Sequence, residues 1–120
     1  MHLNRLVIHK FRNIHNNHLE FCPHKNYLFG DNAQGKTNII EAIYLLCLAK
    51  SFRSREESDL VPFGEHDYFV EGEFTSETSL QHRVAVRYDS NQGKQIHVDH
   101  KRLNQYSKLI GLFPVISLSA

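Results

Sequence analysis

Apolar and polar residues alternate along the start of the chain, as they do in a β-strand with one buried face. Over residues 3–10, Leu6 and Ile8 fall on one face. The polar residues Arg5 and His9 fall on the other. The pattern therefore predicts a strand over residues 3–10 that buries its Leu6 face.

Two further short strands are expected before residue 30. The polar run His15-Asn16-Asn17 predicts a turn, and residues 18–22 predict a strand that ends at Pro23. Together with residues 3–10, this strand is expected to form a hairpin. The apolar run over residues 27–29 predicts a third strand.

Helical spacing of apolar residues begins after position 36. The residues at this spacing, with those that widen the apolar face, are Ile39, Ile40, Ala42, Ile43, Leu45, Leu46, Cys47 and Leu48. Neither proline nor glycine interrupts residues 36–50. We expect a helix that begins at about Gly35.

The second half of the chain predicts an antiparallel meander. Strand patterns cover residues 68–74, 80–88 and 95–99, and polar residues between them supply the turns. Residues 101–110 are expected to hold a short helix, and residues 113–118 a last strand. The fold class is therefore α/β, a mixed sheet with one main helix. We expect residues 1–50 to hold strands, loop and helix, 51–66 a loop, 67–104 an antiparallel β part, and 105–120 a returning helix or strand.

The stretch between the third strand and the helix reads G-x-x-x-x-G-K-T, the phosphate-binding loop of P-loop proteins. Its residues are Gly30, Asp31, Asn32, Ala33, Gln34, Gly35, Lys36 and Thr37. Glycine lets the backbone coil closely around phosphates, and the amide groups between form an anion-binding nest. Lys36 would bind the β- and γ-phosphates, and the Thr37 hydroxyl would ligate nucleotide-bound Mg²⁺. The alternative is an ordinary glycine-rich turn between a strand and a helix.

Composition places few further limits on function. The formal net charge is +1, and no apolar run is long enough to span a membrane, so we expect a cytoplasmic protein. The two cysteines are far apart and do not predict a disulfide. His15, His18 and His24 lie near Cys22, but a zinc site needs four well-spaced ligands, and surface histidines are the simpler interpretation.

The machinery for hydrolysis is not evident beside the phosphate loop. NTP hydrolysis needs an acidic residue at the end of an apolar strand, to support Mg²⁺. Asp89 is the nearest candidate, but Arg87 breaks the apolar run before it. The sequence therefore predicts nucleotide binding and no hydrolysis by these residues alone.

With these motifs in view, the sequence resembles the N-terminal part of the RecF family of bacterial recombination mediators, in the SMC-like group of ABC-type ATPases. The segments that carry the resemblance are residues 6–14, 30–37, 41–44, 51–54 and 112–119. Members are roughly three times as long as this chain. The resemblance implies that the chain is a truncation that stops before the signature motif, the Walker B acids and the switch histidine.

The resemblance also implies further nucleotide contacts. Arg12 and Asn13 are expected to contact phosphate or ribose, although Arg12 has the alternative role of capping a neighbouring loop. Arg53 is expected to sense the γ-phosphate or DNA, although Ser-Phe-Arg-Ser by itself is an ordinary basic loop. Asn38, which follows Thr37, is also expected to contact the nucleotide.

For the whole protein the resemblance implies ATP as cofactor and an ATP-dependent homodimer. Such a dimer binds DNA near gaps and, with RecO and RecR, helps to load RecA onto single strands. The family is a weak DNA-dependent ATPase, and the chain alone is expected to be inactive. The basic residues expected on the surface are Arg53, Arg55, Lys101, Arg102 and Lys108, but acids lie among them, so a mixed-charge surface is an equal interpretation.

Two other function classes stay open. One is an unrelated P-loop kinase or GTPase, which would carry its own acidic strand end and, for a GTPase, a guanine-reading Asn-Lys-x-Asp. Neither appears in the sequence. The other is a β-rich interaction module with a vestigial phosphate loop.

Overall fold

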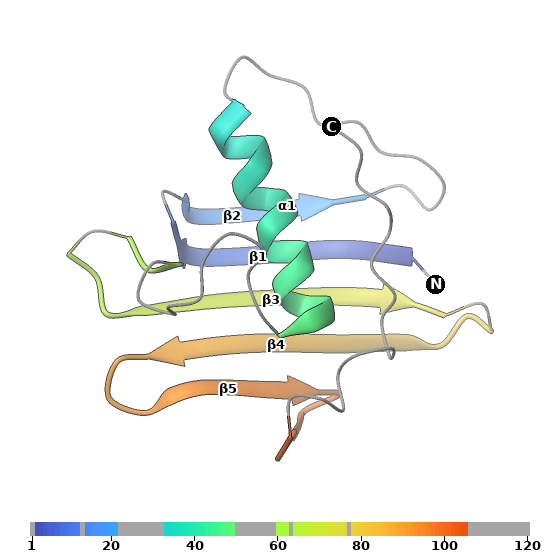
Figure 1. The fold of residues 1–120 in the computed structure, drawn as a ribbon. Helices are drawn as coiled ribbons and strands as arrows, with labels where there is room; N and C mark the ends of the chain where they lie inside the picture. Colours follow the sequence, from blue (N-terminus) through green and yellow to red (C-terminus); the bar gives the residue numbers. More distant parts are fainter. Residues whose placement is uncertain are drawn as a thin grey trace.

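A computed structural model describes residues 2–12, 14–21, 33–49, 60–62, 64–76 and 78–105. In this part of the chain, one helix crosses one face of a six-stranded sheet whose paired strands are all antiparallel (Figure 1). The strand order is β2-β1-β3-β4-β5-β6. The elements are β1 (His2–Phe11), β2 (Ile14–Glu20), α1 (Ala33–Leu48), β3 (Asp67–Thr75), β4 (Gln81–Asp89), β5 (Gly93–Val98) and β6 (Lys101–Arg102).

The strand predicted over residues 3–10 is confirmed as β1, with the buried face that the pattern indicates. Leu6 and Ile8 are fully buried, whereas Arg5 and His9 are exposed. β1 pairs with β2 on one side and with β3 on the other, where Ile8 lies opposite Val70. The N-terminal hairpin and the later meander therefore form a single sheet.

The turn predicted at residues 15–17 is wrong, because β2 already begins at Ile14. Phe11 pairs with Ile14, which leaves a two-residue connection, and Arg12 in that connection has φ 54°. Two-residue hairpin turns favour positive φ, usually at Asn-Gly or Asp-Gly, and this chain lacks that signal here. The polar residues instead lie along β2, which is an edge strand among the described residues, where polar side chains are normal.

The meander is confirmed. β3, β4 and β5 pair in sequence, and Val70, Val86 and Ile96 lie side by side, all fully buried. The helix expected over residues 101–110 is wrong at its start, where Lys101–Arg102 forms β6. Asp99 and His100 both have positive φ, 50° and 70°, so they turn the chain back onto β5 as a type I′ turn does. The rest of that prediction, and the strands expected at 27–29 and 113–118, fall outside the described residues.

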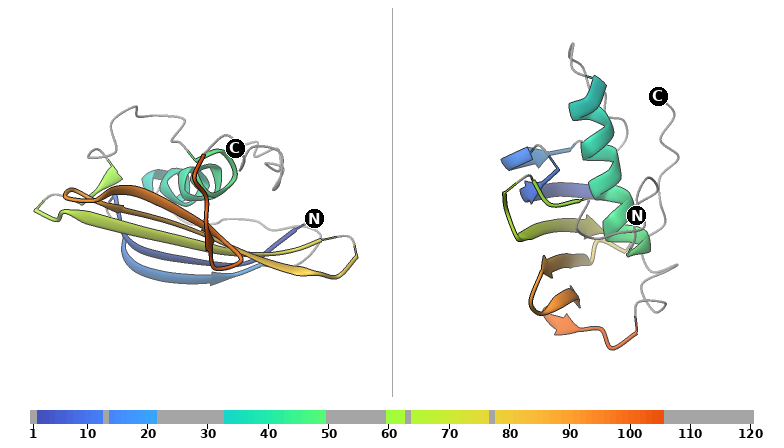
Figure 2. Two further views of the ribbon diagram at one scale, coloured as in Figure 1. Left: turned by 90° about the horizontal axis from the view of Figure 1, so that it is seen from below. Right: turned by 60° about the vertical axis from the view of Figure 1, so that its left-hand side comes forward.

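α1 packs against the centre of the sheet and runs across β1, β3 and β4 rather than along them (Figures 1 and 2). Its residues Ala42, Leu45 and Leu46 are fully buried. A Cβ atom at Gly72 in β3 would lie 2.6 Å from Cδ1 of Leu46. Glycine in the middle of this strand thus allows the close approach of the helix.

The C-terminal end of α1 is capped by a residue from another element. Ala49 follows the helix with φ 63°, the left-handed conformation common at this position. Its carbonyl accepts a hydrogen bond of 2.5 Å from Nζ of Lys94 in β5. The last turn of α1 itself has no basic residue, so Lys94 supplies the positive charge that a helix C-terminus favours.

Candidate nucleotide-binding site

The helix predicted after the phosphate loop is confirmed, and it starts inside the G-x-x-x-x-G-K-T motif. α1 begins at Ala33, two residues earlier than expected, so residues 33–36 form its first turn. The first four amide groups of a helix have no acceptor within that helix, and the helix dipole makes this end positive. The arrangement is that of an anion-binding helix N-terminus.

The structure describes some of the predicted site residues and not others. Thr37 is half-buried on α1, and Asn38 is 1% exposed. Ala33, Gln34, Gly35 and Lys36 are placed by their backbone in the first turn. The residues that fall outside the described part are Asn13, Gly30, Asp31, Asn32 and Arg53.

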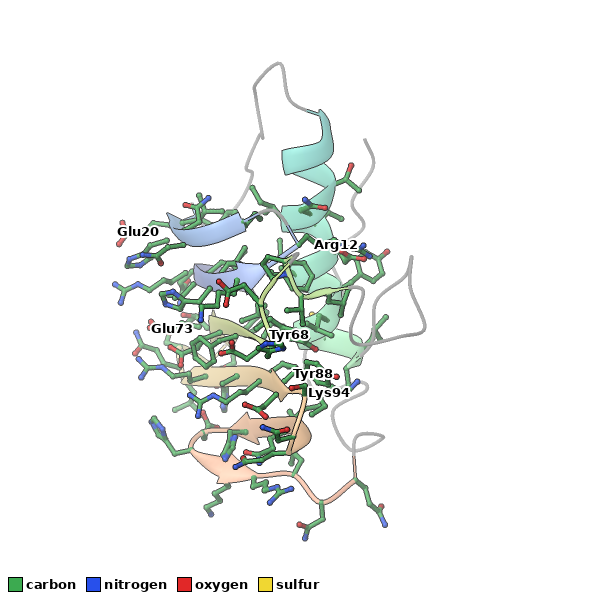
Figure 3. All side chains as sticks on the ribbon, turned by 90° about the vertical axis from the view of Figure 1, so that its left-hand side faces the viewer. Arg12, Glu20, Tyr68, Glu73, Tyr88 and Lys94 are labelled. Atoms are coloured by element: carbon green, nitrogen blue, oxygen red, sulfur yellow. The ribbon has the colours of Figure 1, made fainter. Side chains whose placement is uncertain are left out.

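Arg12 is brought to the helix from the β1–β2 turn (Figure 3). Its Nε donates to Oε1 of Glu41 at 2.6 Å, and its Nη2 donates to Oε2 at 2.8 Å. Its backbone N–H donates to the carbonyl of Leu60 at 2.6 Å. Arg12 therefore joins the turn to α1 through its side chain and to the segment before β3 through its backbone.

Glu41 is a residue of this region to which the sequence analysis assigned no role. It lies four positions after Thr37 on α1 and its side chain is fully buried. The sequence did contain a sign of its importance, because Glu41 is an acidic residue within the otherwise apolar run that follows Asn38. An acidic residue on a buried face requires a partner, but periodicity alone does not say which residue that is.

An aromatic row adjoins the Arg12 turn on the helix side of the sheet. The rings of Phe11 and Tyr68 meet edge to face with centroids 5.7 Å apart, and Tyr68 stacks on Tyr88 at 5.6 Å. Phe11 and Tyr68 are buried, as is Leu60. This packing gives the turn a rigid apolar support.

The pKa values of Cys47 and Lys10 are both raised. Burial raises the pKa of Cys47 to about 11, so its thiol stays protonated at neutral pH and acts as a core residue. The charge of Asp67 and a hydrogen bond to Glu65 raise the pKa of Lys10. Nζ of Lys10 lies 3.4 Å from a carboxylate oxygen of each.

α1 does not cover the opposite face of the sheet, which we call the open face (Figure 2). His9 stacks on Phe69 with ring centroids 5.9 Å apart, and the guanidinium of Arg87 lies 5.2 Å from the centre of the same ring. Phe69 and Arg87, together with Ala85, line a depression on this face. The depression therefore lies across the sheet from α1, the helix that begins inside the phosphate-loop motif.

A family model described as RecF/RecN/SMC N terminal domain matches residues 2–119. The DNA replication and repair protein RecF of Chlamydia muridarum (strain MoPn / Nigg) is 40% identical over 119 residues, 99% of this chain and 32% of that protein. RecF of Caldanaerobacter subterraneus subsp. tengcongensis is 35% identical, over 99% of this chain and 33% of that protein. The chain thus spans about a third of the length of these curated relatives.

Solved structures give the same picture. A structure of the recombination mediator protein RecF with ATP matches with a TM-score of 0.87 and 35% identity, over 94% of this chain and 31% of that one. An SMC ATPase matches with a TM-score of 0.77 at 19% identity, over 92% of this chain and 76% of that one, which shows the fold alone. The α/β fold class of ATPase heads is thereby confirmed.

Proposed function

Because the chain belongs to the RecF/RecN/SMC N terminal domain family, we propose that it is the ATP-binding segment of a RecF-type DNA replication and repair protein. The observation that carries this proposal is the start of α1 inside the phosphate-loop motif, at Ala33. The match to a RecF structure that holds ATP supports the choice of nucleotide. Neither a kinase nor a GTPase has a comparable observation in its favour.

In this proposal the phosphate loop acts through its backbone and two side chains. Amide groups of residues 30–36 would cradle the phosphates, with glycine at Gly30 and Gly35 for close approach. Lys36 would neutralise the β- and γ-phosphates. The half-buried Thr37, just after the first turn, fits a hydroxyl ligand for Mg²⁺ carried by the nucleotide. The Mg²⁺ ion would supply charge neutralisation at the phosphates.

The remaining predicted contacts also enter the proposal. Arg12 and Asn13 would approach phosphate or ribose from the β1–β2 turn, and Arg53 would approach the γ-phosphate or DNA. Asn38 adjoins Thr37 on the buried side of α1 and would support the loop. The pairing of Arg12 with Glu41 already places one of these residues against the helix that carries the loop.

For the whole protein we propose ATP-dependent pairing of two such heads and binding of gapped DNA. Cooperation with RecO- and RecR-type mediators and loading of RecA would follow, in the cytoplasm. α1, the helix in the described part of the chain, does not have the length and apolar character needed to cross a membrane. The curated relatives are DNA replication and repair proteins, which supports this proposal.

The test is Lys36→Ala, measured by titration with a fluorescent ATP analogue. We expect binding to fall by at least about a hundredfold, since a charge-assisted contact to phosphate is lost. Folding should be unchanged, because the substitution removes a charge rather than core. Lys101→Ala, in exposed β6, is the matched control and should bind normally. Equal affinity of Lys36→Ala and the parent would overturn the assignment, and preferential competition by GTP would favour a GTPase.

A further inference from the structure

Glu41 is a fully buried carboxylate within one helical turn of the phosphate loop. It follows Thr37 by four positions on α1, and Asn38, also on this part of the helix, is 1% exposed. Burial of a carboxylate is costly unless charge and hydrogen bonds compensate it. A buried carboxylate at this position therefore points to a role that an apolar residue would not fill.

The partner geometry is specific. Two parallel N–H···O bonds, 2.6 Å and 2.8 Å long, join the guanidinium of Arg12 to the two oxygens of Glu41. A bidentate pair of this kind fixes the plane of the guanidinium as well as its distance. Lysine has a single ammonium group and would not fix that orientation.

The backbone of Arg12 is fastened at the same place. Its φ of 54° lies in the left-handed region that L-residues rarely adopt, and its N–H is held by the carbonyl of Leu60. Such conformations persist where surrounding contacts determine them. The pair with Glu41 is one of those contacts, and it comes from the helix that begins in the phosphate loop.

We propose that Glu41 is a positioning residue for nucleotide binding. It holds the turn that contains Arg12 against α1, so that this turn and the helix that begins inside the phosphate-loop motif keep a fixed position relative to each other when the nucleotide binds. This inference rests on the proposed function of the loop. A second ion pair, Arg5–Glu20, joins β1 to β2. Its N···O distance is 3.6 Å, and its side chains are 47% and 74% exposed. It provides the natural comparison.

The experiment compares Glu41→Gln with Glu20→Gln in the whole protein. Glutamine keeps the size of Glu41 but points an amide N–H₂ at a guanidinium N–H, so one of the two bonds is lost. We expect the ATP-analogue affinity to fall about tenfold for Glu41→Gln, within the range of couplings between contacting residues, and to be unchanged for Glu20→Gln. Equal affinity for Glu41→Gln and the parent overturns the inference.

A purely structural role is tested by Val86→Ala, a substitution in the core of β4 that removes a fully buried side chain. All variants are titrated at a temperature where circular dichroism shows them folded. We expect Val86→Ala to lower the melting temperature and leave ATP affinity unchanged. If it weakens ATP binding as much as Glu41→Gln does, Glu41 acts through stability alone and the inference is wrong.

A double-mutant cycle identifies Arg12 as the group through which Glu41 acts. Arg12→Lys and Glu41→Gln should each weaken ATP binding, and the double variant should be no weaker than the worse single one. If the losses of ATP-binding free energy in the two single variants add up in the double variant, Glu41 does not act through Arg12. If Glu41→Gln does not fold, Glu41→Asp carries the test, since it keeps the charge but shortens the side chain that forms the two bonds to Arg12. A parent protein that binds no ATP would instead refute the proposed function itself.

Discussion

The two faces of the sheet use the same chemical pair in opposite ways. On the helix side, Arg12 and Glu41 are 20% and 0% exposed and joined by two short bonds. On the open face, Arg83 lies 3.6 Å from Glu71 and 3.7 Å from Glu73, and its side chain is 44% exposed. A buried ion pair holds its two side chains in place, because breaking it leaves an uncompensated charge in the protein interior. An exposed pair contributes only about 0–1 kcal/mol to the stability of the fold.

Figure 3 shows this separation directly. Arg12, Tyr68, Tyr88 and Lys94 lie on the side of α1, and Glu20 and Glu73 point the other way. The residues that set the position of the helix, and with it the phosphate loop, are thus on one face. Substitutions on the two faces should therefore differ strongly in their effects.

The largest difference is expected between neighbours on β1. Leu6 is fully buried under α1, whereas Val7 points to the open face and is half-buried. Leu6→Ala should lower the free energy of unfolding by about 2–5 kcal/mol, because it leaves a cavity, and Val7→Ala by less than about 1 kcal/mol. Urea denaturation of both variants provides the measurement. Similar losses would mean that the open face is packed as tightly as the helix face.

A smaller difference is expected when a side chain is enlarged on each face of the sheet. Gly72→Val places its Cβ 2.6 Å from Leu46 under the helix, so we expect a loss of about 1–3 kcal/mol in the free energy of unfolding. Ala85 lines the depression on the open face, so an enlarged side chain there does not press against α1. Ala85→Val should therefore change stability by less than about 0.5 kcal/mol. A tolerated Gly72→Val would show that α1 shifts easily on the sheet.

The smallest effect is expected at an exposed carboxylate and should depend on pH. The hydrogen bond from Nδ1 of His82, at 2.9 Å, and that from the backbone N–H of Arg83 lower the pKa of Asp99 below its ordinary 3.8. In the folded state Asp99 thus releases its proton at a lower pH than in the unfolded state. Its stabilising contribution is complete above 3.8 and is lost as pH falls through the folded pKa.

Asp99→Asn measures this contribution. Asparagine also accepts positive φ, so the turn is kept while the charge is removed. Because the Asp99 side chain is 46% exposed, solvent screening should limit the loss at about pH 6 to less than about 1 kcal/mol. The difference between the two proteins should shrink as the pH falls through the folded-state pKa of Asp99, below 3.8, and it should also shrink in high salt. A difference that grows on acidification would contradict the assigned cause.

Much of the fold could be predicted because periodicity reports burial. Leu6 and Ile8, like Val84 and Val86, recur at every second position of a strand, and all four are fully buried. The turns were harder, since positive φ at Arg12, Asp99 and His100 occurs without the glycine that usually marks it. Local sequence also could not show that β1 pairs with β3, because that pairing joins distant parts of the chain.

The site was predictable to the extent that its chemistry is local. The motif located the start of α1 within two residues, because spacing of glycine and lysine is a local property. The pair between Arg12 and Glu41 spans 29 positions and depends on how the hairpin packs on the helix. The same is true of Lys94, which reaches the end of α1 from β5.

The contact of Lys94 with Ala49 has a mechanical consequence. α1 is fastened near its middle through Glu41, which binds Arg12 in the β1–β2 turn, and at its C-terminal end through Ala49, which binds Lys94 in β5. Two separated contacts hold the helix against sliding along its axis and against rotation about it. A displacement of the N-terminal end of α1 would therefore be transmitted to β5, on the other side of the central strands.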